Sequence, residues 1–289
     1  MKKKLFLTAL CSLIAFSGIS AQSLAPSGDY YKLKKVIPVA GRQGIAVDKD
    51  YYYVSSSTGL YKYDKEGKLI LKNENPFEGF EKPVNHFGDI EVHNGEIITG
   101  VEKFVAGDVE NIQIAIYDAK TLAYKYSIDF GEIEQPEVCG ITVDRKTNTA
   151  WMADWTRGWY AYKYDLNTKK YIGKVHLQPS PQWQQGIYFI DGKILLTADD
   201  GDADLNEPDN IYIADVSDPA KTAVDVTKWR AMTEFKLAGE IEGLTIDPTN
   251  DDLLVLNNRG AIIKMGMPSG FYPGYDKEIH EVYVYERTK

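Results

Sequence analysis

Short stretches in which apolar and polar residues alternate run along most of the chain. The clearest are Leu-Tyr-Lys-Tyr-Asp at residues 60–64, Ile-Ala-Ile-Tyr-Asp at 114–118 and Val-Tyr-Val-Tyr-Glu at 282–286. A period of two places successive side chains on opposite faces, and aromatic and β-branched residues favour strands. No segment shows a convincing helical period over ten residues. The pattern therefore predicts an all-β protein.

These strands recur in a repeated unit. Each unit starts with a small or polar residue followed by a short apolar run. The five starts are residues 43–48, 88–93, 139–144, 185–190 and 242–247, and they lie 45–57 residues apart. Such spacing is typical of the blades of a β-propeller. We therefore expect a five-bladed β-propeller, with a six-bladed propeller or a β-sandwich as the alternatives.

The two ends of the chain are expected to close this ring. The fifth unit runs out of chain after its third strand, and a strand-like stretch at residues 30–39 precedes the first unit. Pairing the N-terminal strand into the last blade would complete that blade and cover an exposed sheet edge. The outer strand of the fourth unit is expected at residues 234–237.

The N-terminus predicts export. Lys2, Lys3 and Lys4 precede a mostly apolar stretch at residues 5–19, and Ala21 offers a small residue for cleavage. This is the pattern of a signal peptide at residues 1–21; a membrane anchor is the alternative, but the stretch is short and interrupted by polar residues. Residues 22–289 are then one propeller domain that is periplasmic, on the cell surface or secreted. We expect a monomer with no membrane insertion after signal removal.

The charge balance narrows the choice of partners. The chain has 33 Lys and Arg against 42 Asp and Glu, a net charge of −9 that becomes −12 once the three lysines of the signal are removed. An acidic surface argues against nucleic acid or anionic membrane as partners. Cys139 is the one cysteine left after export, so the mature chain forms no intramolecular disulfide.

Four segments carry a resemblance to known proteins. They are Gln-Gly-Ile-Ala-Val-Asp at residues 43–48, Asn-His-Phe-Gly-Asp-Ile at 85–90, Glu-Gly-Leu-Thr-Ile-Asp-Pro at 242–248 and Leu-Val-Leu-Asn-Asn-Arg at 254–259. With them the chain resembles secreted bacterial propellers of the NHL, quinoprotein-like and glutamine-cyclotransferase-like kind. The resemblance implies a propeller blade and no single reaction. Plant-type glutaminyl cyclases carry an acidic residue where this chain has Gln43, so their catalytic assignment is not carried over.

Propeller geometry indicates where a site would lie. The turn into each innermost strand and the loop between second and third strands open on one face, around the mouth of the central channel. Polar residues recur at both places in all five units. The ligand-binding candidates are Arg42, Gln43, Glu102, Asp154, Trp155, Arg157, Gln185, Asn257 and Arg259. The alternative is that these groups only brace the loops by hydrogen bonds.

Catalytic and metal roles are predicted at the same mouth. His86, Asp89 and Glu242 are the catalytic candidates, because a nearby carboxylate would raise the pKa of His86 and orient its ring. Asp89, Asp199 and Glu242 are candidate ligands of an axial Ca²⁺, since hard cations take carboxylate and amide oxygens. The aspartates at 200, 202 and 204 resemble a linear calcium loop, but Leu205 stands where an EF-hand needs glycine. A solvated acidic loop is the alternative there.

The loop at residues 259–279 is rich in methionine and aromatic residues and is expected to form a lid over the mouth. Together with Trp155 and Trp159 it would suit a sugar or peptide. We therefore expect a protein that binds a small ligand or an envelope partner at the funnel face, with or without Ca²⁺. The alternatives are a cation-dependent hydrolase, lyase or glutaminyl-cyclotransferase-like enzyme on the same face, and a scaffold. No Ser/His/Asp signature or nucleotide fingerprint is present.

Overall fold

The computed structural model describes residues 27–105, 107–131, 133–234, 239–264 and 267–288. The expected signal peptide at residues 1–21 lies outside these ranges, so export stays a prediction. Two short 3₁₀ helices occur, η1 (Gly28–Tyr30) and η2 (Ala203–Leu205). Within the described ranges, no helix has the length and apolar character needed to cross a membrane.

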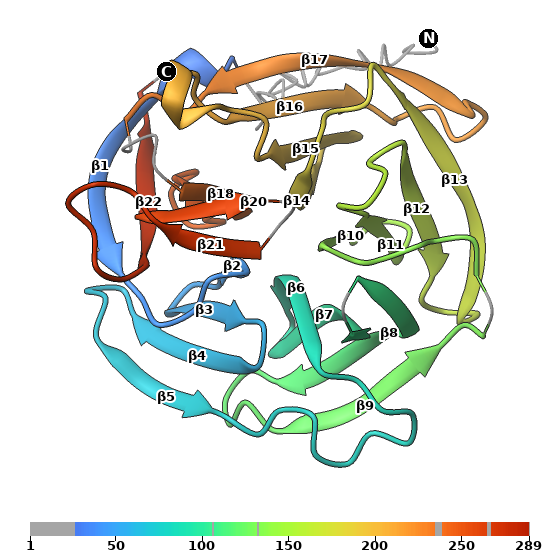
Figure 1. The fold of residues 1–289 in the computed structure, drawn as a ribbon. Helices are drawn as coiled ribbons and strands as arrows, with labels where there is room; N and C mark the ends of the chain where they lie inside the picture. Colours follow the sequence, from blue (N-terminus) through green and yellow to red (C-terminus); the bar gives the residue numbers. More distant parts are fainter. Residues whose placement is uncertain (1–26, 106, 132, 235–238, 265–266, 289) are drawn as a thin grey trace, which may run out of the picture.

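Across the described residues, five four-stranded antiparallel units surround one axis (Figure 1). The first two are β2 (Gly44–Val47), β3 (Tyr51–Ser56), β4 (Gly59–Asp64), β5 (Leu69–Asn73), then β6 (His86–His93), β7 (Glu96–Val105), β8 (Asp108–Asp118), β9 (Tyr124–Asp129). The next two are β10 (Gly140–Asp144), β11 (Thr149–Ala153), β12 (Tyr160–Asp165), β13 (Lys170–Gln178), then β14 (Gln184–Ile190), β15 (Lys193–Ala198), β16 (Asn210–Asp215), β17 (Ala223–Ala231). The last is β18 (Gly239–Ile246), β19 (Leu253–Arg259), β22 (Ile279–Arg287) and β1 (Tyr31–Pro38).

The N-terminal strand closes the ring. β1 pairs antiparallel with β22 along its whole length, so the first and last strands of the chain share one sheet with β19 and β18. The innermost strands contact one another in cyclic order, β2 with β6, then β10, β14 and β18, and β18 again with β2. The predicted all-β propeller is confirmed, as is the place of its N-terminal strand in the last unit.

The third and fourth units are joined at the rim. The outer strands β13 and β17 pair in parallel over three residues each, which merges the two units into one eight-stranded sheet. The outer strand expected at residues 234–237 lies largely outside the described ranges, and β17 takes that place in the unit. The alternation of Val224 and Val226 with polar neighbours was the signal for β17, since both valines are buried.

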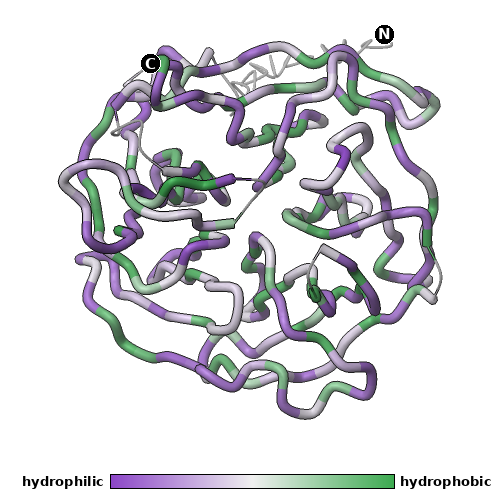
Figure 2. The backbone as a smooth tube through the Cα atoms, viewed as in Figure 1, coloured by the Kyte–Doolittle hydropathy of each residue, from purple (hydrophilic) through white to green (hydrophobic). Residues whose placement is uncertain are grey.

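The hydrophobic core lies between the units rather than within them. Five clusters of buried side chains are present in the described part of the chain, and each joins residues of two successive units. Along β19, Leu253 and Val255 pack toward the fourth unit, whereas Leu254 and Leu256 pack toward the first. Both faces of such a strand are therefore buried, and Figure 2 shows apolar residues recurring around the whole ring. Burial of two faces explains why ring closure stabilises every unit.

Candidate functional site

Asp89 lies buried at the axis of the ring and binds three innermost strands together. Its Oδ1 accepts hydrogen bonds from the backbone N–H groups of Ile45 (3.0 Å) and Ile90 (2.8 Å), and its Oδ2 accepts one from Leu244 (3.3 Å). These donors belong to β2, β6 and β18. Burial raises the pKa of the Asp89 carboxyl, and the three amide donors oppose that shift. Asp89 thus has a structural role, because it connects three innermost strands at the channel.

The glycines of the repeated motif make room for this carboxylate. A Cβ on Gly243 would lie 2.1 Å from Asp89 Oδ1, and a Cβ on Gly186 would lie 2.8 Å from the Cα of Gly243. The innermost strands approach the axis so closely that a side chain does not fit there. The small residues at the start of each unit are therefore required for packing at the centre of the ring, and they do not indicate a catalytic site.

The predicted pairing of His86 with Asp89 is wrong. The strand pairing between β6 and β7 sets His86 opposite Glu102, with His86 Nδ1 3.3 Å from Glu102 Oε1. The register of β6 shifts between Phe87 and Ile90, and this irregularity directs Asp89 to the axis. Neither Asp89's catalytic role nor its role as a metal ligand is supported, because its oxygens are occupied by backbone amides.

A cavity of about 310 Å³ opens at the mouth of the channel, and we call it the funnel pocket. Seven of the predicted residues line it: Arg42, Gln43, His86, Glu102, Trp155, Gln185 and Glu242. The other lining residues are Ser57, Asn85, Phe104, Glu137, Cys139, Glu240, Met267 and Pro268. Met267 and Pro268 come from β21 (Met267–Phe271), which pairs with β20 (Ala261–Lys264) near the centre of the ring (Figure 1). The loop expected as a lid thus contributes to the pocket wall.

Two buried glutamates form one wall of the funnel pocket. Glu102 Oε2 accepts a hydrogen bond from the Val138 N–H (2.9 Å), and Glu137 Oε2 accepts one from the Trp155 N–H (2.5 Å). The other oxygen of Glu102, Oε1, is buried and accepts no hydrogen bond from the described residues. Burial and then the charge of Glu102 raise the pKa of Glu137 well above its usual range. The wall therefore combines an unsatisfied carboxylate oxygen with a carboxyl group that tends to keep its proton.

The lining of the funnel pocket also holds a charged cluster around Arg42. Its Nη2 lies 2.9 Å from Glu240 Oε2 and 3.8 Å from Glu242 Oε1, and its Nε lies 3.4 Å from Glu278 Oε1. The side-chain amide of Gln185 donates to Glu240 Oε1 (2.6 Å). Burial raises the pKa values of both Glu240 and Glu242, and Arg42 opposes this in each case. One guanidinium thus faces three carboxyl groups.

A second acidic cavity of about 280 Å³ adjoins the funnel pocket and shares Trp155 with it. Trp183 and Tyr272 add aromatic surface, and Asp199 and Asp209 face each other in it. Burial, followed by the charges of nearby acids, raises the pKa of Asp209 to about 7. Burial also raises the pKa of Asp199 well above its usual range. The aspartate pair is therefore poised to hold a proton near neutral pH.

The four remaining ligand-binding candidates do not line the funnel pocket. The carboxylate of Asp154 accepts hydrogen bonds from the backbone N–H groups of Arg157 (2.6 Å) and Gly158 (3.0 Å), so it braces its own loop. Arg157 places its guanidinium 5.6 Å from the ring of Trp159. Arg259 forms a two-pronged ion pair with Glu281 at 2.8 and 3.0 Å. Asn257 is fully buried, with its amide N–H 3.5 Å from the carbonyl of Val255.

The predicted calcium ligands do not form one donor set. Asp89 is held by backbone amides at the axis, Glu242 accepts from the Asn258 side chain (2.6 Å), and Asp199 faces Asp209. No group of three His, Cys, Asp or Glu side chains suited to a metal ion occurs in the part of the chain that the structure describes. In the acidic loop, Asp202 accepts from the N–H groups of its own turn. These positions give the calcium prediction no support, and it stays a prediction.

Glu137 and Glu240 are pocket residues at the turns into the innermost strands, where the sequence predicts polar residues of the mouth, but they were not among the binding or catalytic candidates. Each stands two positions before the first residue of the repeated motif in its unit, Cys139 or Glu242. Residues two apart in an extended chain face the same way, so this spacing was the available signal. Trp183 carries no such signal, because it lies in the turn before β14 with a positive φ of 51°.

No known protein family and no curated protein matches this sequence. Among solved structures, the chain is similar to the glutaminyl cyclase of Myxococcus xanthus, with a TM-score of 0.56 at 10% identity, over 88% of this chain and 96% of that one. It is also similar to a gluconolactonase of Xanthomonas campestris (TM-score 0.48, 10% identity, 84% and 72% covered). A third is the PQQ-bound aldose sugar dehydrogenase of Streptomyces coelicolor (TM-score 0.47, 12% identity, 91% and 100% covered).

The likeness is one of fold. At 10% identity the match to the glutaminyl cyclase supports the propeller architecture and transfers no residue role. The expected resemblance to propellers is thus confirmed at the level of fold, and membership in the NHL group gains no support from a family match.

Proposed function

We propose that this propeller binds a small molecule with a protonated amino group in the funnel pocket. The supporting observation is Glu102 Oε1, a fully buried carboxylate oxygen in the pocket wall that accepts no hydrogen bond from the described residues, although His86 Nδ1 lies 3.3 Å away. A buried anionic acceptor left unsatisfied costs several kcal/mol unless a ligand or solvent donates to it. An ammonium group would supply both the donor and the opposite charge.

The charge balance of the pocket favours a cation. Glu102, Glu137, Glu240 and Glu242 line it. Of the basic residues in the lining, Arg42 is engaged with Glu240 and Glu242, and His86 lies 3.3 Å from Glu102. A bound cation near Glu102 and Glu137 would stabilise the ionised form of Glu137, whose pKa is raised by burial and by Glu102. Affinity is therefore expected to increase as the pH rises and Glu137 loses its proton.

The apolar part of the wall suits the remainder of such a ligand. Phe104, Trp155, Met267 and Pro268 line the same cavity. Its volume of about 310 Å³ lies at the lower end of the range of small-molecule pockets. A single amino acid or a short peptide end fits this combination of size, aromatic surface and carboxylates.

Calorimetry with a dipeptide amide that has a free α-amine, compared with its N-acetylated form, would test the proposal. We expect the free amine to bind and the acetylated form to bind at least about tenfold more weakly, because acetylation removes the charge. Glu102→Gln should weaken binding of the amine by a similar factor. The matched control is Glu110→Gln, since Glu110 is an exposed residue of the same unit that pairs with Lys103. Equal affinity for both peptides, or an unchanged affinity in Glu102→Gln, would contradict the proposal.

An enzyme acting at the same wall is the second candidate. General acid–base catalysis uses a carboxyl group whose pKa is raised by its surroundings, and Glu137, which is buried beside Glu102, has this character. One similar structure is named as a glutaminyl cyclase, so a peptide with N-terminal glutamine is the test substrate. If this candidate holds, Glu137→Gln should lower turnover by about 100-fold or more while Glu110→Gln does not. Absence of turnover in the unaltered protein would leave ligand binding as the function.

A further inference from the structure

A further cavity of about 750 Å³ lies away from the funnel pocket, between the third and fourth units. The funnel pocket is lined by residues at the start of the innermost strands, whereas this cavity is lined by the turns at their far ends, Asp144–Thr147 and Asp191–Gly192. Since an innermost strand crosses the thickness of the ring, the two sites open on opposite faces. We call this second site the inter-blade cavity.

The cavity lies beside the contact between the outer strands of the third and fourth units. β13 and β17 pair only over His176–Gln178 and Ala223–Asp225, and the space beneath this short contact is bordered by Val175 and Val224. Both valines are buried and belong to the hydrophobic cluster that also contains Trp151. The two units therefore pack against each other beneath the rim contact, and the cavity borders this packed cluster.

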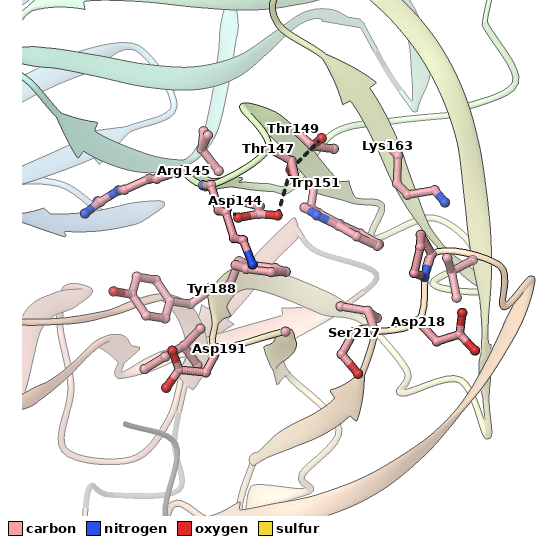
Figure 3. A pocket seen from close by; sticks show the side chains of 18 of the residues that line it. Asp144, Arg145, Thr147, Thr149, Trp151, Lys163, Tyr188, Asp191, Ser217 and Asp218 are labelled. Carbon is pink, nitrogen blue, oxygen red and sulfur yellow. Dashed lines mark hydrogen bonds between the residues drawn. The ribbon is translucent and has the colours of Figure 1, made fainter. Parts of the chain in front are cut away.

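Aromatic residues form the inner wall. Trp151 of β11 and Phe189 of β14 stack across the junction, with ring centroids 6.2 Å apart and planes at 20°. Tyr188 and Val216 line the same space. Figure 3 shows Trp151 and Lys163 on one side of the space, with Ser217 and Asp218 from the fourth unit facing them. A flat apolar body would be covered by rings on one side and by aliphatic side chains on the other.

The polar groups of the wall leave one half-buried cation unpaired. Asp144 accepts hydrogen bonds from its own turn, through Lys146 N–H (3.0 Å) and the Thr147 hydroxyl (2.7 Å). Glu91 is paired with Arg145 at 2.9 Å. Lys163 lies opposite Trp151 in the β11–β12 pairing and places its Nζ 5.7 Å from the indole centroid. In the described ranges no carboxylate pairs with it, so its ammonium group can meet an anion.

We propose that the inter-blade cavity binds an aromatic carboxylate. The apolar body would pack against Trp151 and Phe189, opposite Val216 and Val224, and the carboxylate would accept hydrogen bonds from Lys163 Nζ. Charge complementarity carries the choice of ligand. The acids of the lining, Asp144, Glu91, Asp191 and Asp218, are engaged with protein partners. By contrast, Lys163 forms no salt bridge within the described residues, and neither do Lys146 and Lys221 of the same lining. This site is independent of the funnel pocket, which favours the opposite charge.

Titrating the protein with 1-naphthaleneacetate and with its neutral analogue 1-naphthaleneacetamide tests this proposal. Tryptophan fluorescence and calorimetry measure the affinity for each compound. We expect the acid to bind about tenfold more tightly than the amide, because both fill the cavity and only one meets Lys163 as an anion. Lys163→Gln should remove most of that difference while leaving the amide's affinity unchanged. Lys120→Gln is the matched control, since Lys120 is an exposed lysine in a turn of another unit.

A second variant keeps the test independent of folding effects. Trp151→Phe preserves a ring against Phe189 and should still bind the acid, with the fluorescence change at this tryptophan lost. Equal affinity for acid and amide in the unaltered protein would overturn the proposal, as would an identical loss in Lys163→Gln and Lys120→Gln. Absence of binding for both compounds at millimolar concentration would also overturn it. Glu102→Gln should leave the acid's affinity unchanged, which separates this site from the proposed function.

Discussion

Asp89→Ala is expected to destabilise the fold by about 3–5 kcal/mol, because the substitution leaves buried amide donors of three innermost strands without an acceptor. Each buried N–H left unsatisfied costs about 1–3 kcal/mol. The lost hydrogen bonds lie where β2, β6 and β18 meet. The substitution should therefore lower the stability of the whole ring rather than that of one unit. Denaturant unfolding of the purified variants measures it.

Two companion variants define what that result means. Asp89→Asn retains one oxygen acceptor and should lose less stability than Asp89→Ala. Asp50→Ala, in an exposed turn of the first unit, should change stability by no more than about 0.5 kcal/mol. Because Asp89 does not line the funnel pocket, folded Asp89→Asn should bind the test dipeptide with unaltered affinity. An unchanged unfolding midpoint in Asp89→Ala would refute the fastening role.

Arg42→Ala is expected to have the next largest effect, about 3 kcal/mol at pH 8 and clearly less at pH 5. Arg42 is the cation facing Glu240, Glu242 and Glu278, and removing one partner of a buried ion pair leaves uncompensated charge. The folded pKa values of Glu240 and Glu242 are raised above their usual value, first by burial. Such groups contribute stability that is fully present below the unfolded pKa and is lost as the pH rises through the folded pKa.

The raised pKa values of Glu240 and Glu242 explain why the stability loss in Arg42→Ala should be larger at pH 8 than at pH 5. Without Arg42 the pKa values of both glutamates rise further, so at pH 5 they keep their protons and tolerate burial. At pH 8 they must ionise without a partner or hold protons against the solvent. Unfolding curves at the two pH values measure the effect, and Arg157→Ala, an exposed arginine beside Trp159, is the control. A loss of equal size at pH 5 and pH 8 would show that Arg42 acts through packing alone.

Much of the architecture could be predicted because it depends on local pattern. Alternating apolar and polar residues, such as those of β4 and β22, predict strands, since the side-chain period of a strand is two. The motif that recurs every 45–57 residues predicts structural units that bury their faces against each other. The N-terminal strand could be placed in the last sheet because an unpaired edge is unfavourable and the fifth unit lacked a strand.

The funnel pocket could be predicted only in part. Seven candidates line it, because the starts of the innermost strands and the loops after the second strands do meet at one mouth. The role of Asp89 could not be foreseen, since the shift of register between Phe87 and Ile90 decides where its side chain points. A single-residue shift reverses the face that a strand residue presents, and sequence alone does not show it.

The sequence by itself therefore determined the strands, the number of repeats and the acidic character of the mouth, because these follow from residue type and spacing. Only the tertiary structure decided which carboxylates fasten the ring and which face a cavity, since that depends on distances of a few ångströms between units far apart in the chain. The same holds for the inter-blade cavity. It borders the short parallel contact between β13 and β17, which no property of either strand alone specifies.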